Sequence, residues 1–268
     1  MKKPVIVVAH NGTADVPARY ELANIDALVR TRFPAHEVRW ALTSPWMIGN
    51  LKKREFADIF PPPPGRNPET VQGLPDLYAE LAAAGKRDVV VVLLMIHECG
   101  ASLDIYALPA PGLNLRFVKP LMSHEHNVDT LAAAVAPQFG GAGTVNVLVG
   151  HGNLKQFDLN DSFEFLAEYV KQRYDNVFVG TLHGPPGTEA AFAAARASGA
   201  TETLFLPLMI IDGGHITSDI MADTPESWKN QIGLPARVGD SFSRNDKGMQ
   251  LYLTGISKQL ARFPADKL

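Results

Sequence analysis

The sequence predicts an α/β protein with parallel sheets flanked by helices, and two patterns lead to this fold class. Short apolar runs bounded by turn residues recur at 5–9, 89–96, 145–149, 177–179 and 204–211. Such runs suit strands that are buried on both faces of a parallel sheet. Amphipathic stretches typical of helices separate them, at 19–32, 75–84, 128–135, 162–172 and 189–197. Alternating strands and helices predict doubly wound sheets, whose sites lie at the carboxyl ends of the strands.

The two halves of the chain also resemble each other. The matching pairs, first half against second, are residues 5–12 (VIVVAHNG) with 145–152 (VNVLVGHG), 37–45 (EVRWALTSP) with 176–185 (NVFVGTLHGP), and 93–96 (LLMI) with 207–210 (PLMI). The pairs follow the same order in both halves. We therefore expect two pseudo-repeated lobes, at residues 1–140 and 141–268, with a cleft between them.

The first lobe carries an extra segment around residues 51–75 that has no counterpart in the second half. Four consecutive prolines at 61–64 lie within it. Proline fixes φ and lacks a backbone donor, so this tract predicts a stiff surface loop. The alternative is a flap over the cleft.

Composition excludes several classes of function. With 46% hydrophobic and 20% charged residues, the 268-residue chain is an ordinary globular protein. Its net charge of -3 lacks the basic excess that nucleic acid or anionic lipid requires. Cys99 is the only cysteine, which excludes an internal disulfide and a cysteine zinc cluster. No run approaches the ~20 apolar residues of a membrane span, so we expect a cytoplasmic protein without a membrane partner.

Three histidines follow predicted strands of the second lobe, and each stands close to glycine: His151, His183 and His215. Because neighbouring strand ends converge on one crevice, these side chains could form a single nitrogen-ligand metal site. Imidazole suits cobalt, nickel, iron and zinc, and spacing does not distinguish them. The alternative is that each histidine is a satisfied structural residue at its strand end.

The first lobe offers two further candidates, His10 and His97. His10 is the counterpart of His151, so we expect it to face His151 across the cleft, where it would contact substrate or a second metal. His97 and Glu98 follow the strand that ends at Ile96 and are candidates for substrate contact. A capping or surface role is the alternative for His10.

The remaining histidines and the cysteine give weaker indications of a functional site. His124 and His126 precede a helix and suggest a cap or solvated turn, His36 suggests a surface position, and Cys99 a small buried filler. The chain has no Gly-x-Ser-x-Gly elbow, no P-loop and no Gly-x-Gly-x-x-Gly after a strand. Nucleophilic hydrolysis and nucleotide chemistry therefore lose their usual support.

The second lobe resembles the CbiK-type anaerobic cobalt chelatases, the sirohydrochlorin cobaltochelatases of the class II chelatase fold. The resemblance is carried by residues 206–222 (LPLMIIDGGHITSDIMA), 223–229 (DTPESWK), 150–152 (GHG) and 178–181 (FVGT), and more loosely by 43–52. It implies a lyase of cobalamin biosynthesis that inserts Co²⁺ into sirohydrochlorin or a close relative. The metal is then a substrate, and no organic cofactor is expected.

The same resemblance assigns roles to individual residues. His151 and His215 are expected to bind the metal and to act as catalytic bases, since metal insertion removes two pyrrole protons, and His183 is expected as a third ligand. Lys155 is the cation nearest to His151 for an anionic macrocycle. The family has glutamate where His183 stands. A non-catalytic tetrapyrrole or metal carrier, and a nickel or iron chelatase, are the alternatives; a homo-oligomer is compatible with the sequence.

Overall fold

The computed structural model describes residues 3–154 and 156–264, which form two compact units. The first unit comprises Met1–Met95, Ala101–Pro120 and Gln250–Leu268, and the second comprises Ile96–Gly100 and Leu121–Met249. This division differs from the expected boundary at residue 140. The difference arises because the C-terminal helix packs within the first unit, while residues 121–140 pack within the second.

The first unit is built on a four-stranded parallel sheet with the order β2-β1-β3-β4. Its strands are β1 (Val5–His10), β2 (Val38–Leu42), β3 (Asp88–Leu93) and β4 (Asn114–Val118). Every residue of the two central strands is buried, as expected for solid apolar runs covered on both faces. The carboxyl end of β1 therefore places His10 at one edge of this sheet.

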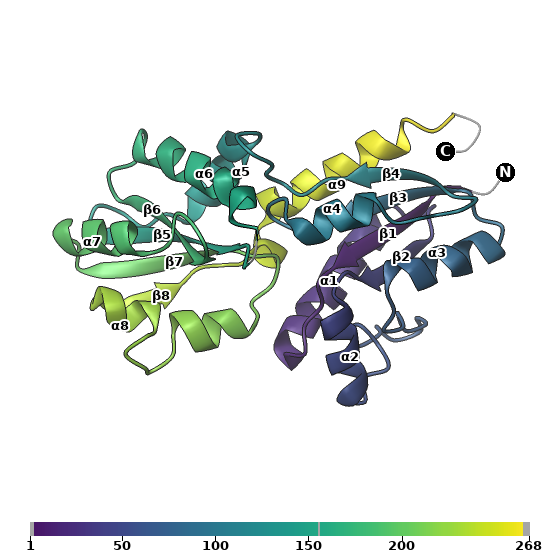
Figure 1. Cartoon of the computed structure of the whole chain (residues 1–268), viewed down its shortest axis with the longest axis horizontal. Coiled ribbons are helices and arrows are strands. Elements are labelled where there is room, and N and C mark those ends of the chain that lie inside the picture. The colour runs from purple at the N-terminus through teal and green to yellow at the C-terminus, as the bar shows by residue number, and fades with distance from the viewer. Residues whose placement is uncertain (1–2, 155, 265–268) are drawn as a thin grey trace. The chain divides into compact units, whose positions relative to one another are not determined.

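The unit contains, wholly or largely, the helices α1 (Val16–Arg32), α2 (Pro45–Lys53), α3 (Leu74–Ala83), α4 (Gly100–Tyr106) and α9 (Asp246–Leu260) (Figure 1). The first two begin with side-chain caps: Asp15 accepts from the Ala18 backbone N–H at 2.9 Å, and Ser44 accepts from Met47 at 3.1 Å. Each cap is followed by a proline in the first helical turn, where the missing donor is not needed.

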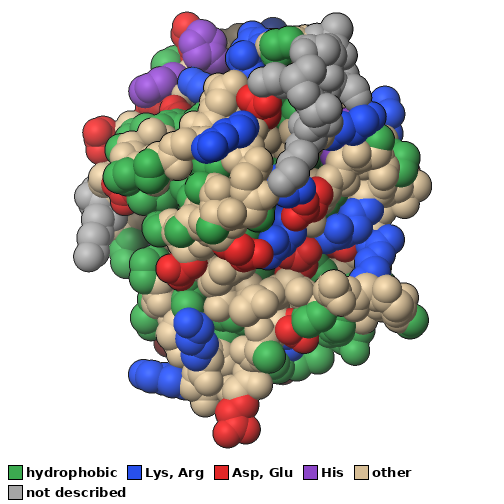
Figure 2. All heavy atoms as spheres, turned by 90° about the vertical axis from the view of Figure 1, so that its right-hand side faces the viewer, with side chains coloured by type: hydrophobic (Ala, Val, Ile, Leu, Met, Phe, Trp, Pro, Cys, Tyr) green, Lys and Arg blue, Asp and Glu red, His purple; other side chains and the backbone are tan. Residues whose placement is uncertain are grey.

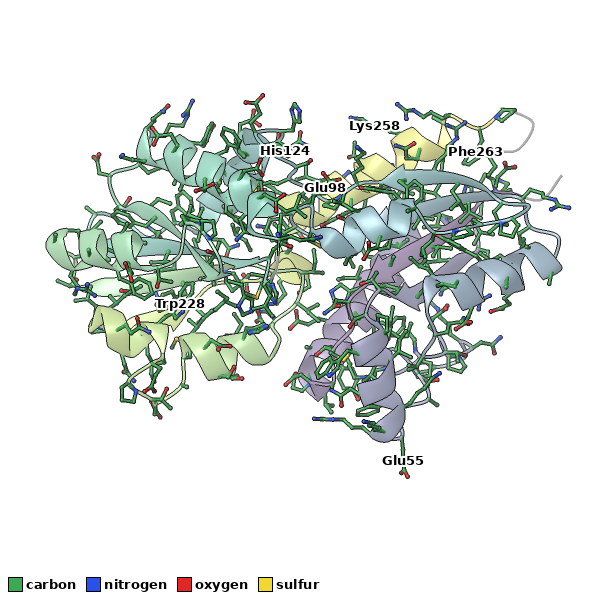
Figure 3. All side chains as sticks on the ribbon, viewed as in Figure 1. Glu55, Glu98, His124, Trp228, Lys258 and Phe263 are labelled. Atoms are coloured by element: carbon green, nitrogen blue, oxygen red, sulfur yellow. The ribbon has the colours of Figure 1, made fainter. Side chains whose placement is uncertain are left out.

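The second unit repeats the arrangement with the strand order β6-β5-β7-β8, again all parallel. Its elements are β5 (Thr144–Gly152), β6 (Val177–His183), β7 (Glu202–Leu208), β8 (Ala236–Val238), α5 (Val128–Val135), α6 (Asp161–Lys171), α7 (Glu189–Ala197), α8 (Trp228–Ile232) and the π-helical turn Ile216–Ile220. Trp228, labelled in Figure 3, packs against the rings of Phe192 and Phe205 and closes the core between α7, α8 and the sheet.

The strand orders confirm the predicted α/β class and the internal repeat. In each sheet the first strand lies between the second and the third, and the fourth lies outside the third. The paired segments recognised in the sequence fall on β1 and β5, on β2 and β6, and at the ends of β3 and β7. The carboxyl ends of corresponding strands therefore have corresponding neighbours within each sheet.

The extra segment of the first unit is anchored to α1. Asp58 and Thr70 form an isolated antiparallel bridge at its base. The Arg19 guanidinium donates to the Asp58 carbonyl at 2.6 Å, and Arg66 pairs with the buried Asp26 carboxylate at 3.1 Å. The proline run is thus part of a loop fixed at its base, and its stiffness stays a prediction.

Charged side chains of both signs are interspersed on the face shown in Figure 2. In the first unit, for example, Arg39 pairs with Glu80 at 2.8 Å and lies 3.8 Å from Glu37. In the described part of the chain, none of the helices combines the length and the apolar character that crossing a membrane requires.

Candidate functional site

Three histidines meet at the carboxyl edge of the second sheet. His151 lies one residue before the end of β5, His183 is the last residue of β6, and His215 precedes the π-helical turn that follows β7. The ring centroids are 5.1 Å apart for His151 and His183, 4.9 Å for His151 and His215, and 6.2 Å for His183 and His215. The structure thus brings together the three residues that the sequence singles out.

Glycine on both sides of His151 makes this approach of the strands possible. A Cβ atom on Gly150 would lie 2.5 Å from the buried Phe163 ring. Gly152 has φ of +70°, and a Cβ there would lie 2.0 Å from the His183 carbonyl oxygen. A side chain at Gly152 would force the ends of β5 and β6 apart, and one at Gly150 would clash with Phe163 of α6. The Gly-His-Gly sequence is therefore the local reason why His151 and His183 are neighbours.

Hydrogen bonds determine which ring nitrogen of two of these histidines is free. The Nδ1 atom of His151 lies 2.9 Å from the Gly152 carbonyl oxygen, and the Nδ1 atom of His215 lies 2.9 Å from a carboxylate oxygen of Asp219. Both partners are acceptors, so Nδ1 carries the proton in each ring. The Nε2 atom then keeps its lone pair, which is the form of imidazole that binds a metal.

Two of the three ring separations match those of imidazoles that share one metal ion, and the third is longer. Imidazoles bound tetrahedrally at ~2.1 Å have centroids about 5 Å apart. In the described residues, no group of three or more His, Cys, Asp or Glu side chains is already arranged as a set of metal ligands. The rings instead meet edge to face, at 70° to 80°. The backbone therefore sets the spacing, and rotation of the rings would set the coordination.

The surroundings of the site favour neutral imidazole. Desolvation lowers the pKa of His151 even though the residue keeps exposed surface, and it also lowers the pKa of His183. The proximity of His215 lowers both pKa values further. A lowered pKa favours the uncharged form of both rings at neutral pH.

His97 belongs to the second unit and lies beside this site. Its buried ring packs 4.6 Å from the Phe163 ring, and its Nε2 atom lies 3.3 Å from the Asn153 side-chain nitrogen. Burial, followed by the charge of His151, lowers its pKa to about 4. These contacts make His97 a packed neighbour of the site, and its contact with substrate stays a prediction.

A buried asparagine that the sequence analysis missed fixes the loop of His183. The Asn160 side-chain oxygen accepts from the Asn153 backbone at 2.8 Å and from its side chain at 2.9 Å. Its nitrogen donates to the carbonyl oxygens of His183 at 2.7 Å and Pro185 at 2.9 Å. Asn160 thereby joins the ends of β5 and β6 to the start of α6. Nothing in its local sequence distinguishes it from an ordinary residue before a helix.

The other residues that the sequence suggests as candidates lie away from the three histidines or fall outside the described residues. Lys155 falls outside the described residues. His124 contacts the Asp161 carboxylate, which raises the pKa of this exposed histidine. Glu98 accepts from Ser123 at 2.6 Å; Figure 3 labels Glu98 and His124. This is the polar turn expected before α5.

His10 is a buried neutral histidine of the first unit. Its Nδ1 atom accepts from the Gly12 backbone N–H at 2.9 Å, and burial lowers its pKa to about 4. The expectation that it faces His151 stays a prediction, because the two residues belong to different units.

The burial of His10 leads to a prediction about stability and pH. Its pKa of about 4 in the folded protein lies below the ordinary 6.5, so its stabilising contribution is complete above pH 6.5 and is lost as pH falls toward 4. We expect a loss of about 3 kcal/mol in the unfolding free energy of the first unit over this range. In urea titrations at several pH values, the His10→Asn variant should have a shallower pH dependence than the wild type. Equal slopes would contradict this assignment.

Solved structures show that this architecture is the chelatase fold. SirB from Bacillus subtilis with Fe³⁺ matches 97% of this chain and 96% of its own, at 13% identity and a TM-score of 0.64. The sirohydrochlorin chelatase SirB from Bacillus subtilis subspecies spizizenii in complex with cobalt matches the same shares at 11% identity and a TM-score of 0.60.

Sequence comparisons indicate which kind of chelatase the chain resembles. Residues 111–237 match the family model described as Cobalt chelatase (CbiK). Sirohydrochlorin cobaltochelatase CbiKC of Nitratidesulfovibrio vulgaris is 24% identical over 238 residues, which cover 87% of this chain and 80% of the relative. Sirohydrochlorin cobaltochelatase of Salmonella typhimurium is 23% identical over 244 residues, 88% of each chain. The chain is therefore similar to the CbiK-type cobalt chelatases, and the resemblance stated above is confirmed.

Proposed function

We propose that this protein is a metal chelatase that inserts Co²⁺ into sirohydrochlorin or a closely related tetrapyrrole. The observation that carries the proposal is the group formed by His151, His183 and His215, three imidazoles at one sheet edge with centroids 4.9 to 6.2 Å apart. The relation to proteins named sirohydrochlorin cobaltochelatase supports the substrate and the metal.

The chemistry requires a metal-binding group and a proton acceptor in the same place. Insertion exchanges one divalent cation for two pyrrole protons, so both protons must leave the macrocycle as the metal enters. In the proposed mechanism His151, His183 and His215 hold Co²⁺, the second substrate, through neutral nitrogen atoms. When the metal passes to the macrocycle, the released lone pairs accept the protons and return them to water. The lowered pKa values of His151 and His183 favour that return.

Substrate contacts are part of the proposal. We assign Lys155, His97 and His10 to the recognition of the macrocycle. Lys155 would pair with its anionic substituents, since it is close to His151 in sequence. The assignment of His97 is supported by its contact with Asn153, two residues after His151.

The direct test is an insertion assay with the purified protein. Sirohydrochlorin and Co²⁺ should give the absorption spectrum of the metallated product faster with the protein than without it. A non-catalytic carrier would bind the macrocycle without accelerating its metallation, and that result would contradict the proposal. Parallel reactions with Ni²⁺ and Fe²⁺ should be slower; a faster reaction with either would assign the chelatase to that metal.

His183 provides a prediction within the proposed site. The His183→Glu variant should bind Co²⁺ more tightly than the wild type at mildly acidic pH, because a carboxylate stays ionised where imidazole begins to take up protons. It should also accelerate insertion if proton removal limits the rate. Calorimetry and the insertion assay at about pH 5.5 and 7.5 would measure both effects. If neither changes, His183 is a structural residue of the strand end rather than a metal ligand.

A further inference from the structure

The three imidazoles carry no negative charge, whereas the proposed metal substrate is a cation. The carboxylate of Asp219 is hydrogen-bonded to this group: its side-chain oxygen lies 2.9 Å from Nδ1 of His215. The π-helical turn Ile216–Ile220 creates this contact, because it brings residue 219 back beside residue 215. Asp219 is therefore positioned by the backbone that follows β7.

The carboxylate of Asp219 also acts on the other two histidines. Its charge opposes the lowering of the pKa at both His151 and His183. The Ser218 hydroxyl lies 2.8 Å from the same carboxylate oxygen that accepts from His215. Desolvation is opposed by the hydrogen bonds from His215 and Ser218, and the net effect lowers the pKa of Asp219. The side chain is thus an anion that is hydrogen-bonded to the His215 ring.

We propose that Asp219 is a positioning residue of the metal site, which holds the Nδ1 proton of His215, keeps the Nε2 lone pair free for the metal, and supplies the negative charge that the imidazoles lack. The role for the metal rests on the proposed function. The effect on His215 does not, because a hydrogen bond at one ring nitrogen determines where the proton sits in the metal-free protein as well.

The first experiment needs neither metal nor macrocycle. Nitrogen-15 NMR of the full-length protein at neutral pH should show His215 protonated at Nδ1 and unprotonated at Nε2. The Asp219→Ala variant should shift this ring toward the Nε2-protonated tautomer. In Asp219→Asn, the amide oxygen can still accept from Nδ1, so the tautomer should be retained. An unchanged His215 tautomer in Asp219→Ala would overturn the proposal.

The second experiment separates charge from orientation. Calorimetric titration with Co²⁺ should show about tenfold weaker binding in Asp219→Asn and a larger loss, up to about 100-fold, in Asp219→Ala. Asp223→Asn is the matched control, since it removes the same charge from an exposed side chain that pairs with Lys229. Its affinity should stay within about twofold of the wild type.

The outcomes distinguish this inference from the proposed function. If the wild type fails to insert Co²⁺ but Asp219→Ala changes the tautomer of His215, the proposed function fails and the positioning role stands. Affinities of both Asp219 variants within twofold of the wild type would remove Asp219 from the metal site. Circular dichroism of each variant checks that the half-exposed substitution leaves the fold intact.

Discussion

Replacing His151 or His215 by alanine is expected to weaken Co²⁺ binding and to slow insertion by more than about 100-fold. Loss of a group that merely orients a ligand costs 10- to 100-fold in affinity or activity, so loss of a ligand itself should cost more. The second unit should remain folded, because His151 lies near the end of β5, His215 lies in the loop after β7, and neither belongs to the apolar core.

Calorimetry with Co²⁺ and the insertion assay measure the two effects, and circular dichroism checks the fold. His126→Ala is a suitable control, since it removes an exposed histidine from the polar turn before α5. Undiminished Co²⁺ affinity in both the His151 and the His215 variants would remove the metal site from this edge of the sheet.

Replacing Asn160 by alanine is expected to lower the unfolding free energy of the second unit by about 3 kcal/mol. The substitution removes four hydrogen bonds at 2.7 to 2.9 Å from a fully buried side chain. It also leaves the Asn153 and His183 backbone groups without these partners, which is the costly case for buried polar atoms. Co²⁺ affinity should fall too, because the loop that carries His183 loses its anchor.

Urea unfolding of the second unit measures the first effect. Asn230→Ala is the matched control: the exposed Asn230 side chain donates to two loop carbonyls, so the change should cost no more than about 0.5 kcal/mol. An Asn160→Ala variant within 1 kcal/mol of the wild type would contradict the proposed role.

The central strands could be predicted from the sequence, whereas the edge strands β4 and β8 could not. β1, β3, β5 and β7 are continuous apolar runs because both faces of each strand are covered. β4 alternates apolar residues with Arg116, and β8 has only three residues, so neither carries this signal. The membership of α9 in the first unit depends on contacts far apart in the chain, which no local pattern records.

The candidate site likewise has a part that could be predicted from the sequence and a part that could not. The histidines could be predicted because each follows a recognisable strand and lies close to glycine, and parallel strands bring their ends together. Asn160 and Asp219 could not be predicted as partners. Asn160 acts through hydrogen bonds to segments 7 and 23 to 25 positions away. Asp219 stands four positions after His215, but only the conformation of the following turn makes that spacing a contact.

The path of the chain between the units has a consequence for protein synthesis. The first unit includes the residues from Gln250 onward, which are synthesised after the second unit. The Tyr252 hydroxyl donates to the Met95 carbonyl at 2.6 Å, and Gly255 lies close enough to Val118 that a Cβ would meet it at 2.7 Å. During synthesis, the first sheet therefore lacks helix α9 until after the second unit has been made. Expression of the halves separated at residue 140 would leave the N-terminal half without that helix.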